Sequence, residues 1–377
     1  MPSLLLINLS EHTISIIFDL CNIEYSKMKG NKPSKKKIPY PVTKNLEDYL
    51  TKYNRKVTLP IQYEDMLCYE AGIPLINRAG QDTHWKSVVY QEYDKKQIYG
   101  ELCEVYALLK TDGDTSVIEH LTVDRVDYCV FGNTHPFRVR IINNLNDNYD
   151  HFYIKTIDAS RIYGLELEEL LSPNNVTYLI DRETLVEEHI AGIPGDDFME
   201  NNLNVTEFDE IRIAKEFIKF NERCFIRLLG DMRSYNYIID ITPDIEGAQY
   251  RIRAIDFDQQ SYEGRKSFYL PQYFKENNPI IEMGLKHLSP KTVKQYQLEE
   301  RSLISRRIKM SRSRIVQLIN CMRKEKLSST KKIIQLREEL AYHHKHDSFL
   351  ACETMGEIVL NNLKLLLQKE FIQGIIS

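Results

Sequence analysis

The sequence predicts an α+β fold in which antiparallel strands are followed by a long helical region. Between residues 126 and 190, short alternating apolar runs are separated by turn residues, as in antiparallel sheets. Residues 207–221 carry apolar side chains near helical spacing, which predicts an amphipathic helix. Beyond Pro290 the chain is charged and nearly free of Gly and Pro, so helices are expected to continue toward the C-terminus.

The composition is that of a folded protein with more than one structural unit. The chain has 377 residues, of which 42% are hydrophobic and 28% charged, and two or three domains are expected at this length. The net charge of −4 is small, so no nucleic-acid partner is expected and no attraction to an acidic membrane surface is implied. No apolar run approaches eighteen residues, so no membrane span is expected.

The N-terminus and the cysteines both indicate a cytoplasmic protein. The first residues lack the basic stretch that begins a secretory signal. The seven cysteines are odd in number and scattered, which is typical of reduced thiols and not of a disulfide framework.

Residues 1–125 are expected to form a separate N-terminal α+β domain of unknown role. Residues 4–6 and 13–18 resemble strands, and the Pro- and Lys-rich stretch at 32–42 is typical of an exposed loop. Residues 97–109 fit a helix or a strand equally well. We find no motif here that carries chemistry.

From residue 126 onward, five strands and one helix are expected. The helix follows the third strand; Asp158 or Ser160 would cap it, and it would end before Ser172. The strands are expected at residues 128–133, 137–142, 151–155, 176–180 and 184–186. A further hairpin is expected at 237–255, after the helix at 207–221.

The pattern of greatest chemical interest lies on either side of that hairpin. Asp231 and Asn236 are five residues apart, and Asp256 and Asp258 follow an apolar strand. Phosphoryl transfer requires a carboxylate that orients the acceptor hydroxyl and oxygen ligands that hold magnesium. A buried strand that ends in two acids is also costly unless a cation or donors satisfy them.

Together, this order of elements and motifs resembles a protein-kinase-like fold. The resemblance covers about residues 126–270. It is closer to the atypical branches than to eukaryotic protein kinases; these branches are the aminoglycoside and choline phosphotransferases, the persister-toxin kinases and the spore-coat kinases. It implies a two-lobed core, with an N-terminal lobe at 126–190 and a C-terminal lobe with a helical extension at 191–377. Leu228 and Leu229 stand near the place of the family's catalytic-loop histidine, and no Ala-Pro-Glu segment follows Asp258.

The resemblance also implies roles for the acidic motif. Asp231 matches the catalytic aspartate, and Arg233 stands where protein kinases often carry a lysine that contacts the γ-phosphate. Asn236 and Asp256 match the magnesium ligands, and Asp258 would be a further ligand in the Asp-Phe-Asp form of the metal-binding motif.

The nucleotide site would come from the strands before this motif. Lys155 matches the lysine that binds the α- and β-phosphates; Glu166 is its first-choice partner, Glu169 the alternative, and Glu168 is expected to face solvent. The glycine-rich loop is reduced to Gly132, so Asn133 and Thr134 are expected to donate to phosphate. The backbone of Glu188 to Ile190 would bind the adenine edge.

The resemblance therefore implies an enzyme that uses ATP and Mg²⁺ to phosphorylate a hydroxyl group. The acceptor would be a small molecule or a specialised protein. Two alternatives stay open: a pseudokinase or interaction module that binds nucleotide weakly or not at all, and an AMP transferase that binds ATP in reverse. Retention of Lys155, Asp231, Asn236 and Asp256 favours an active kinase over a pseudokinase.

Overall fold

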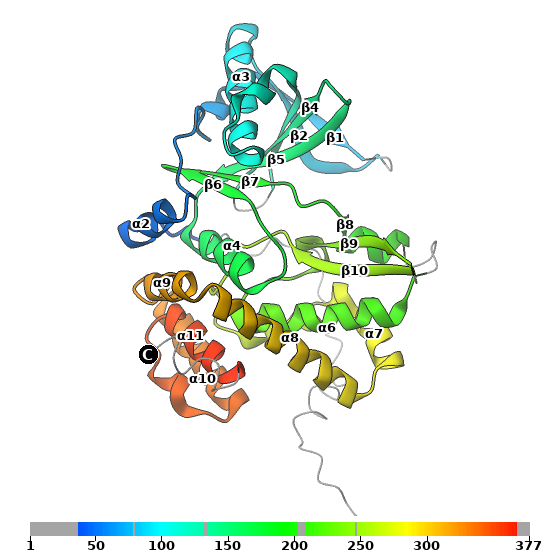
Figure 1. Cartoon of the computed structure of the whole chain (residues 1–377), viewed down its shortest axis with the longest axis vertical. Coiled ribbons are helices and arrows are strands. Elements are labelled where there is room, and N and C mark those ends of the chain that lie inside the picture. Colours follow the sequence, from blue (N-terminus) through cyan, green and yellow to red (C-terminus); the bar gives the residue numbers. More distant parts are fainter. Residues whose placement is uncertain (1–36, 78–79, 132–133, 203–207, 246, 368–377) are drawn as a thin grey trace, which may run out of the picture.

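The computed structural model describes residues 37–77, 80–131, 134–202, 208–245 and 247–367. Among these residues, most strands belong to the first half of the chain and lie in the upper part of Figure 1. Most helices belong to the second half of the chain and lie in the lower part. The expected α+β class is therefore confirmed as a mixed fold with antiparallel sheets and many helices. The strands expected at 4–6 and 13–18 lie outside the described residues.

Seven antiparallel strands form the larger sheet, in the order β1-β2-β3-β4-β5-β7-β6. The strands are β1 (Ala71–Ile76), β2 (Asp82–Val89), β3 (Leu121–Cys129), β4 (Phe137–Asn143), β5 (Asn148–Thr156), β6 (Tyr178–Asp181) and β7 (Thr184–Glu188). Along β4 the buried residues alternate with half-buried ones, because successive side chains point to opposite faces.

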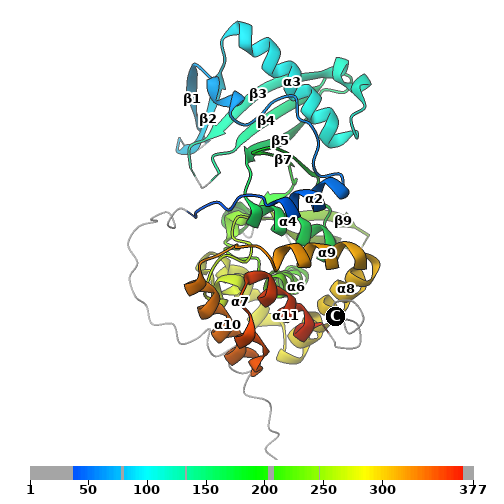
Figure 2. The same ribbon diagram turned by 90° about the vertical axis from the view of Figure 1, so that its left-hand side faces the viewer.

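Helix α3 (Glu92–Lys110) covers one face of this sheet (Figure 2). Ile98, Leu102, Val105 and Leu109 recur at three- and four-residue spacing and are buried against the sheet. The segment that fitted helix or strand equally in the sequence is thus a helix, and the sheet supplies the surface that its apolar face needs.

The domain boundary expected at 125/126 falls inside β3. Trp85 of β2 pairs with Cys129 of β3, so the strands before and after this boundary belong to one sheet. Residues 71–110 and residues 121–154 also share one hydrophobic cluster.

Helix α4 (Ala159–Leu171) lies between the sheet and the helical part (Figure 1). Every residue of α4 except Glu169 is buried, including Arg161, Glu166 and Glu168. The segment before α2 (Lys44–Lys52) binds its N-terminal end: Tyr40 N–H donates to Asp158 Oδ1 at 2.8 Å, and Ala159 N–H donates to the Tyr40 carbonyl at 2.9 Å.

The remaining elements form a three-stranded sheet and a helical assembly. The sheet contains β8 (Ile193–Pro194), β9 (Tyr237–Asp244) and β10 (Gly247–Ala254), in the order β10-β9-β8. The helices are α5 (Gly195–Asp197), α6 (Glu210–Arg227), α7 (Asn278–His287), α8 (Pro290–Met310), α9 (Arg312–Met322), α10 (Thr330–His344) and α11 (Met355–Leu366). No helix in the described part of the chain combines the length and apolar character needed to cross a bilayer.

Helix α6 is the centre of this assembly and contacts α7, α8, α11 and β10 (Figure 2). It begins three residues later than expected because Asp209 caps it, accepting from the backbone N–H groups of Ile211 and Arg212. It ends at Arg227, and the positive φ of 57° at the next residue, Leu228, turns the chain into the loop that carries Asp231.

Gly164 of α4 provides a test of how closely α4 packs against the segment that carries Phe257. A Cβ at this position would lie 2.8 Å from Phe257 Cβ, whereas a Cβ at Gly100 of α3 would meet nothing within 4 Å. We expect Gly164→Ala to lower the free energy of unfolding by about 1–3 kcal/mol through overpacking. Gly100→Ala should instead raise it by about 0.5–1 kcal/mol, because alanine favours helix. Urea unfolding of both variants measures the difference, and equal effects would contradict this packing.

Candidate active site

Two loops that lie far apart in the sequence are held together by backbone hydrogen bonds. Gly230 N–H donates to the Gln259 carbonyl at 3.3 Å, and Ser261 N–H donates to the Leu228 carbonyl at 2.8 Å. On the other side, Ile255 N–H donates to the Asn236 carbonyl at 3.0 Å. These contacts bring the Asp231–Asn236 loop beside the Asp256–Asp258 loop.

The Asp231 backbone adopts an uncommon conformation with φ 61°. Its N–H donates to the Phe268 carbonyl at 3.1 Å, and its carbonyl accepts from Asn236 Nδ2 at 2.7 Å. Leu228, three residues earlier, also has positive φ. Strained residues of this kind persist only where the surroundings hold them, and they gather at functional sites.

The Asp231 carboxylate is poised to titrate near neutral pH. Burial raises its pKa to about 6, and the nearby Asp256 charge adds to this, while Arg233 opposes it. Arg233 Nε donates to Asp231 Oδ1 at 3.1 Å, and its Nη1 donates to Glu276 Oε1 at 2.6 Å. A carboxylate with such a pKa can both accept and release a proton near pH 7.

Arg161 joins three carboxylates at the centre of the site. Its side chain is 2% exposed. Nη1 lies 2.9 Å from Asp256 Oδ1 and 2.7 Å from Asp258 Oδ1, while Nη2 lies 2.8 Å from Glu187 Oε2. The guanidinium thus pairs with Glu187 of β7 and with Asp256 and Asp258 after β10. Asp256 and Asp258 are two of the residues expected to hold magnesium.

Lys155 binds Glu187 on the neighbouring strand, with 2.6 Å between Nζ and Oε2. Burial works against ionised Glu187, but the charges of Arg161 and Lys155 outweigh it and lower its pKa to about 2. Burial and the Arg161 charge lower the pKa of Lys155, although Glu187 opposes this. The expected pairing of Lys155 with Glu166 or Glu169 is therefore wrong.

The acids of α4 bind arginines from other parts of the chain instead. Glu166 accepts from Arg55 Nε at 3.1 Å and from Arg314 Nη2 at 2.8 Å. Glu169 lies 3.5 Å from Arg55. The expectation that Glu168 faces solvent is wrong, because Glu168 is buried and forms an ion pair with Arg227.

The pKa values of Asp256 and Asp258 are shifted in opposite directions. Burial and the adjacent Asp258 charge raise the pKa of Asp256, whose side chain keeps a third of its surface exposed. Burial also disfavours ionised Asp258, but Arg161 and Lys37 outweigh it, so its pKa is lowered. Lys37 also binds Asp158 and the Asp258 carbonyl.

Of the residues expected to contact adenine and phosphate, Thr134, Glu188 and Ile190 lie in the described part of the chain. Glu188 Oε1 accepts from Thr177 N–H at 2.7 Å, and Ile190 is buried in the core of the helical part. Gly132 and Asn133 lie outside the described residues, and Thr134 beside them is half-buried. In the described part of the chain, no three or more His, Cys, Asp and Glu side chains gather as a metal-binding group.

Sequence reasoning missed Arg161, Glu187 and Lys37. The register observed in the structure identifies Glu187: Lys155 pairs with Leu185 and Tyr153 with Glu187, so Lys155 and Glu187 share one face. No local pattern marks Arg161, which precedes a run of apolar helix residues, or Lys37, which lies in a Lys-rich stretch.

Comparisons with known proteins give distant structural similarities. No model of a known protein family matches the chain, and no curated protein sequence matches it. The structure is similar to titin kinase with its flanking domains, at 15% identity and a TM-score of 0.28, over 64% of this chain and 54% of that one. It is also similar to the autoinhibited serine kinase domain of the giant muscle protein titin, at 14% identity and a TM-score of 0.28, over 64% of this chain and 92% of that one. The chain thus spans about half the length of the first of these structures.

The raised pKa of Asp231 predicts a pH-dependent stability difference. The ionised form is disfavoured in the folded state, so the wild type loses stability relative to Asp231→Asn as pH rises from about 4 through about 6. We expect the variant to gain up to about 3 kcal/mol relative to wild type between pH 4 and pH 7.5. Urea unfolding across this range measures the gain. Asp147→Asn is the matched control, because Asp147 is exposed and also has positive φ; a pH-independent difference for Asp231→Asn would contradict the account.

Removal of Arg161 should leave three buried or half-buried acids without their main cation. We expect Arg161→Gln to lower the free energy of unfolding by about 3–5 kcal/mol. Adding Glu187→Gln should recover part of this loss, because one uncompensated charge is removed. Arg306→Gln, at an exposed arginine of α8, should change stability by less than about 0.5 kcal/mol. Additive effects of the two substitutions in denaturant unfolding would show that Arg161 does not depend on Glu187.

Proposed function

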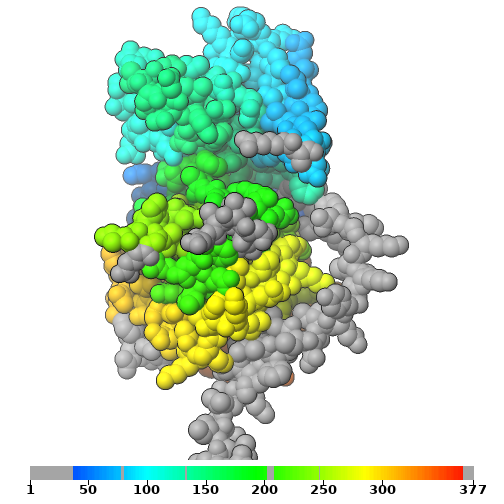
Figure 3. Space-filling view, turned by 90° about the vertical axis from the view of Figure 1, so that its right-hand side faces the viewer, coloured from blue at the N-terminus to red at the C-terminus, as the bar shows by residue number. Residues whose placement is uncertain are grey.

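We propose that the chain is an ATP- and Mg²⁺-dependent phosphotransferase that moves the γ-phosphoryl group of ATP to a hydroxyl group. The acceptor would be a small molecule or a specialised protein. The seven-stranded sheet and the helical part would act as the two lobes of a kinase-like core. In Figure 3, the cyan residues of the earlier part of the chain lie above the green and yellow residues that follow them. The observation that carries the proposal is the backbone pairing of residues 228–236 with 255–261. It brings the partly buried Asp231 carboxylate near the side chains of Asn236 and Asp256, whose oxygens would serve as metal ligands.

Asp231 would accept the proton of the acceptor hydroxyl. Its pKa of about 6 leaves it mostly ionised at neutral pH, yet close enough to that pH for efficient proton transfer. Arg233 holds one carboxylate oxygen of Asp231 and is about a third exposed, so it could also contact an incoming phosphate.

Asn236 and Asp256 offer oxygens that suit Mg²⁺. Among the described residues, neither Asn236 Oδ1 nor Asp256 Oδ2 has a hydrogen-bond partner. Carboxylate and amide oxygens are the hard ligands that this ion prefers. Bound Mg²⁺ would neutralise charge on the phosphates of ATP. Asp258 fits this role less well, because its side chain is only 11% exposed, whereas that of Asp256 is a third exposed.

Lys155 would bind phosphate oxygens, with Glu187 holding its ammonium group in place. The backbone from Glu188 to Ile190 would bind the adenine edge. Ile190 N–H makes no hydrogen bond to any described residue, so a donor is free for a ligand there.

A second candidate function, an interaction module that does not need nucleotide, is favoured by one observation. Arg161 and Lys37 supply positive charge to Asp256 and Asp258 from within the chain. An internal cation that satisfies these acids removes part of the electrostatic gain from a metal ion. Metal-dependent nucleotide binding separates the two functions.

Thermal unfolding with Mg-ATP, with ATP and EDTA, and without ligand tests the proposal. At a ligand concentration a hundred times Kd, binding should stabilise the fold by about 2.7 kcal/mol. We expect the gain to require Mg²⁺ and to disappear in Asp256→Asn, while Asp244→Asn, at an exposed position of β9, keeps it. No gain in folded wild type would favour the interaction module. The mass of any product then separates transfer of phosphate from transfer of AMP.

A further inference from the structure

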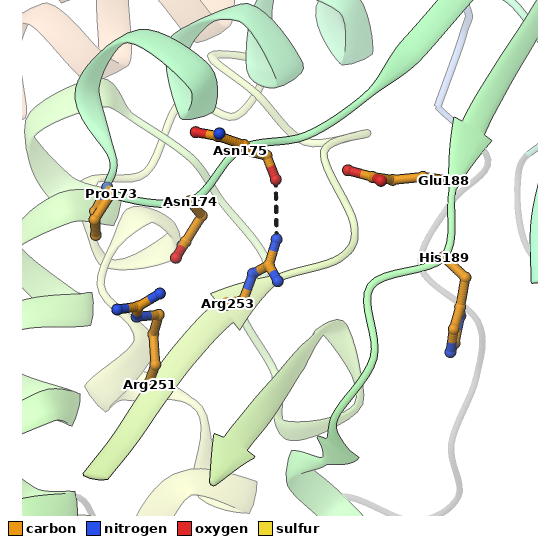
Figure 4. Close-up of a pocket in the computed structure, with 7 residues that line it drawn as sticks. All are labelled: Pro173, Asn174, Asn175, Glu188, His189, Arg251 and Arg253. Atoms are coloured by element: carbon orange, nitrogen blue, oxygen red, sulfur yellow. Dashed lines mark hydrogen bonds between the residues drawn. The ribbon is translucent and has the colours of Figure 1, made fainter. Parts of the chain in front are cut away.

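A pocket lies away from the Arg161 cluster, between the sheet and the helical part. It has a volume of about 330 Å³ and is lined from three segments: the α4–β6 connection, the end of β7 and strand β10 (Figure 4). Its polar lining residues are Asn174, Asn175, Glu188, His189, Arg251 and Arg253.

This pocket opens on the opposite side of β7 from the candidate active site. Neighbouring residues of a strand point to opposite faces. Glu187 points toward Lys155, and Glu188, the next residue, lines the pocket. A ligand in the pocket would therefore lie apart from the phosphate contact proposed at Lys155, while Glu188 and His189 border both the pocket and the proposed adenine contact.

The charges around the pocket favour an anion. Arg251 is exposed and Arg253 half-buried, and both are permanently charged. The negative charge of Glu188 is already partnered, because Lys110 Nζ lies 3.2 Å from Oε2 and Thr177 N–H donates to Oε1. Burial lowers the pKa of His189, so its ring is neutral at pH 7.

Two buried polar atoms of the pocket residues lack partners among the described residues. Asn174 is 3% exposed; its Nδ2 donates to Glu168 Oε1 at 2.9 Å, but its Oδ1 accepts no hydrogen bond. Arg253 Nη2 donates to the Asn175 carbonyl at 3.0 Å, while its Nε has no acceptor. A buried polar group without a partner costs free energy, so a ligand that offers both an acceptor and a donor is favoured here.

We propose that this pocket is a second binding site that takes a small phosphate-bearing ligand. A hydrogen phosphate group offers acceptor oxygens to Arg251 and Arg253 and one O–H donor to Asn174. Bound phosphate would link β10 to the α4–β6 connection, so occupancy would stabilise the contact between these two segments. This proposal does not depend on the proposed catalytic function.

Isothermal titration with inorganic phosphate tests the site, at constant ionic strength and without nucleotide or Mg²⁺. We expect saturable binding of one phosphate to the full chain. Arg253→Gln should weaken it about tenfold or more, because a charge-assisted hydrogen bond is lost. Arg306→Gln, which removes an exposed arginine elsewhere, should leave the affinity unchanged.

Lys155→Met locates the bound phosphate. We expect this variant to bind phosphate like the wild type, because Lys155 faces the other side of the sheet from the pocket. Loss of binding in Lys155→Met but not in Arg253→Gln would place the anion in the candidate active site and overturn the proposal. The proposal would also be overturned if Arg306→Gln weakened phosphate binding as much as Arg253→Gln does. The same holds if titration with phosphate released no more heat than titration with sodium chloride at the same ionic strength. Circular dichroism checks that each variant is folded.

Discussion

The fold depends on the burial of charged side chains along α4. Arg161, Glu166 and Glu168 are each at most 2% exposed. A buried charge is tolerated only when it is paired and hydrogen-bonded, so each of them requires a partner from another segment. Arg161 binds acids from β7 and from the segment after β10, Glu166 binds arginines near α2 and in α9, and Glu168 binds Arg227 at the end of α6.

These pairings connect the chain's outer segments to the candidate site. Arg314 of α9 and Arg55, just after α2, meet at Glu166, five residues along α4 from Arg161. Phe257, between the two acids of the site, packs against Gly164 in the same helix. The position of Asp256 and Asp258 is therefore set by a helix that contacts both the sheet and the C-terminal helices. Arg161 stabilises the two acids in this arrangement. It also competes with any metal ion for their oxygens.

Local patterns in the sequence predicted much of the secondary structure. Residues 137–142 were assigned correctly to a strand, and the helix expected at 207–221 is present at Glu210–Arg227, because one buried face gives each a clear period. The proximity of Asp231, Asn236 and Asp256 also followed from the hairpin between them, which returns the chain to its starting point. Their roles in catalysis stay predictions.

Long-range pairings could not be predicted in the same way. The partner of Lys155 depends on the register of β5 against β7, and neither strand encodes that register alone. Glu168 was misplaced because α4 is buried on all sides, so its acids do not mark a solvent face. The boundary at 125/126 was drawn where the pattern became regular, although β2 and β3 pair across it in one sheet.

Direct titration of Mg-ATP into the wild type and Lys155→Met tests the central claim, that the acids gathered around Arg161 form a nucleotide site with Lys155. The account predicts saturable binding of one nucleotide to the wild type and at least about tenfold weaker binding to Lys155→Met, because a charge-assisted contact to phosphate is lost. Undiminished binding to Lys155→Met, or no binding to folded wild type, would contradict it.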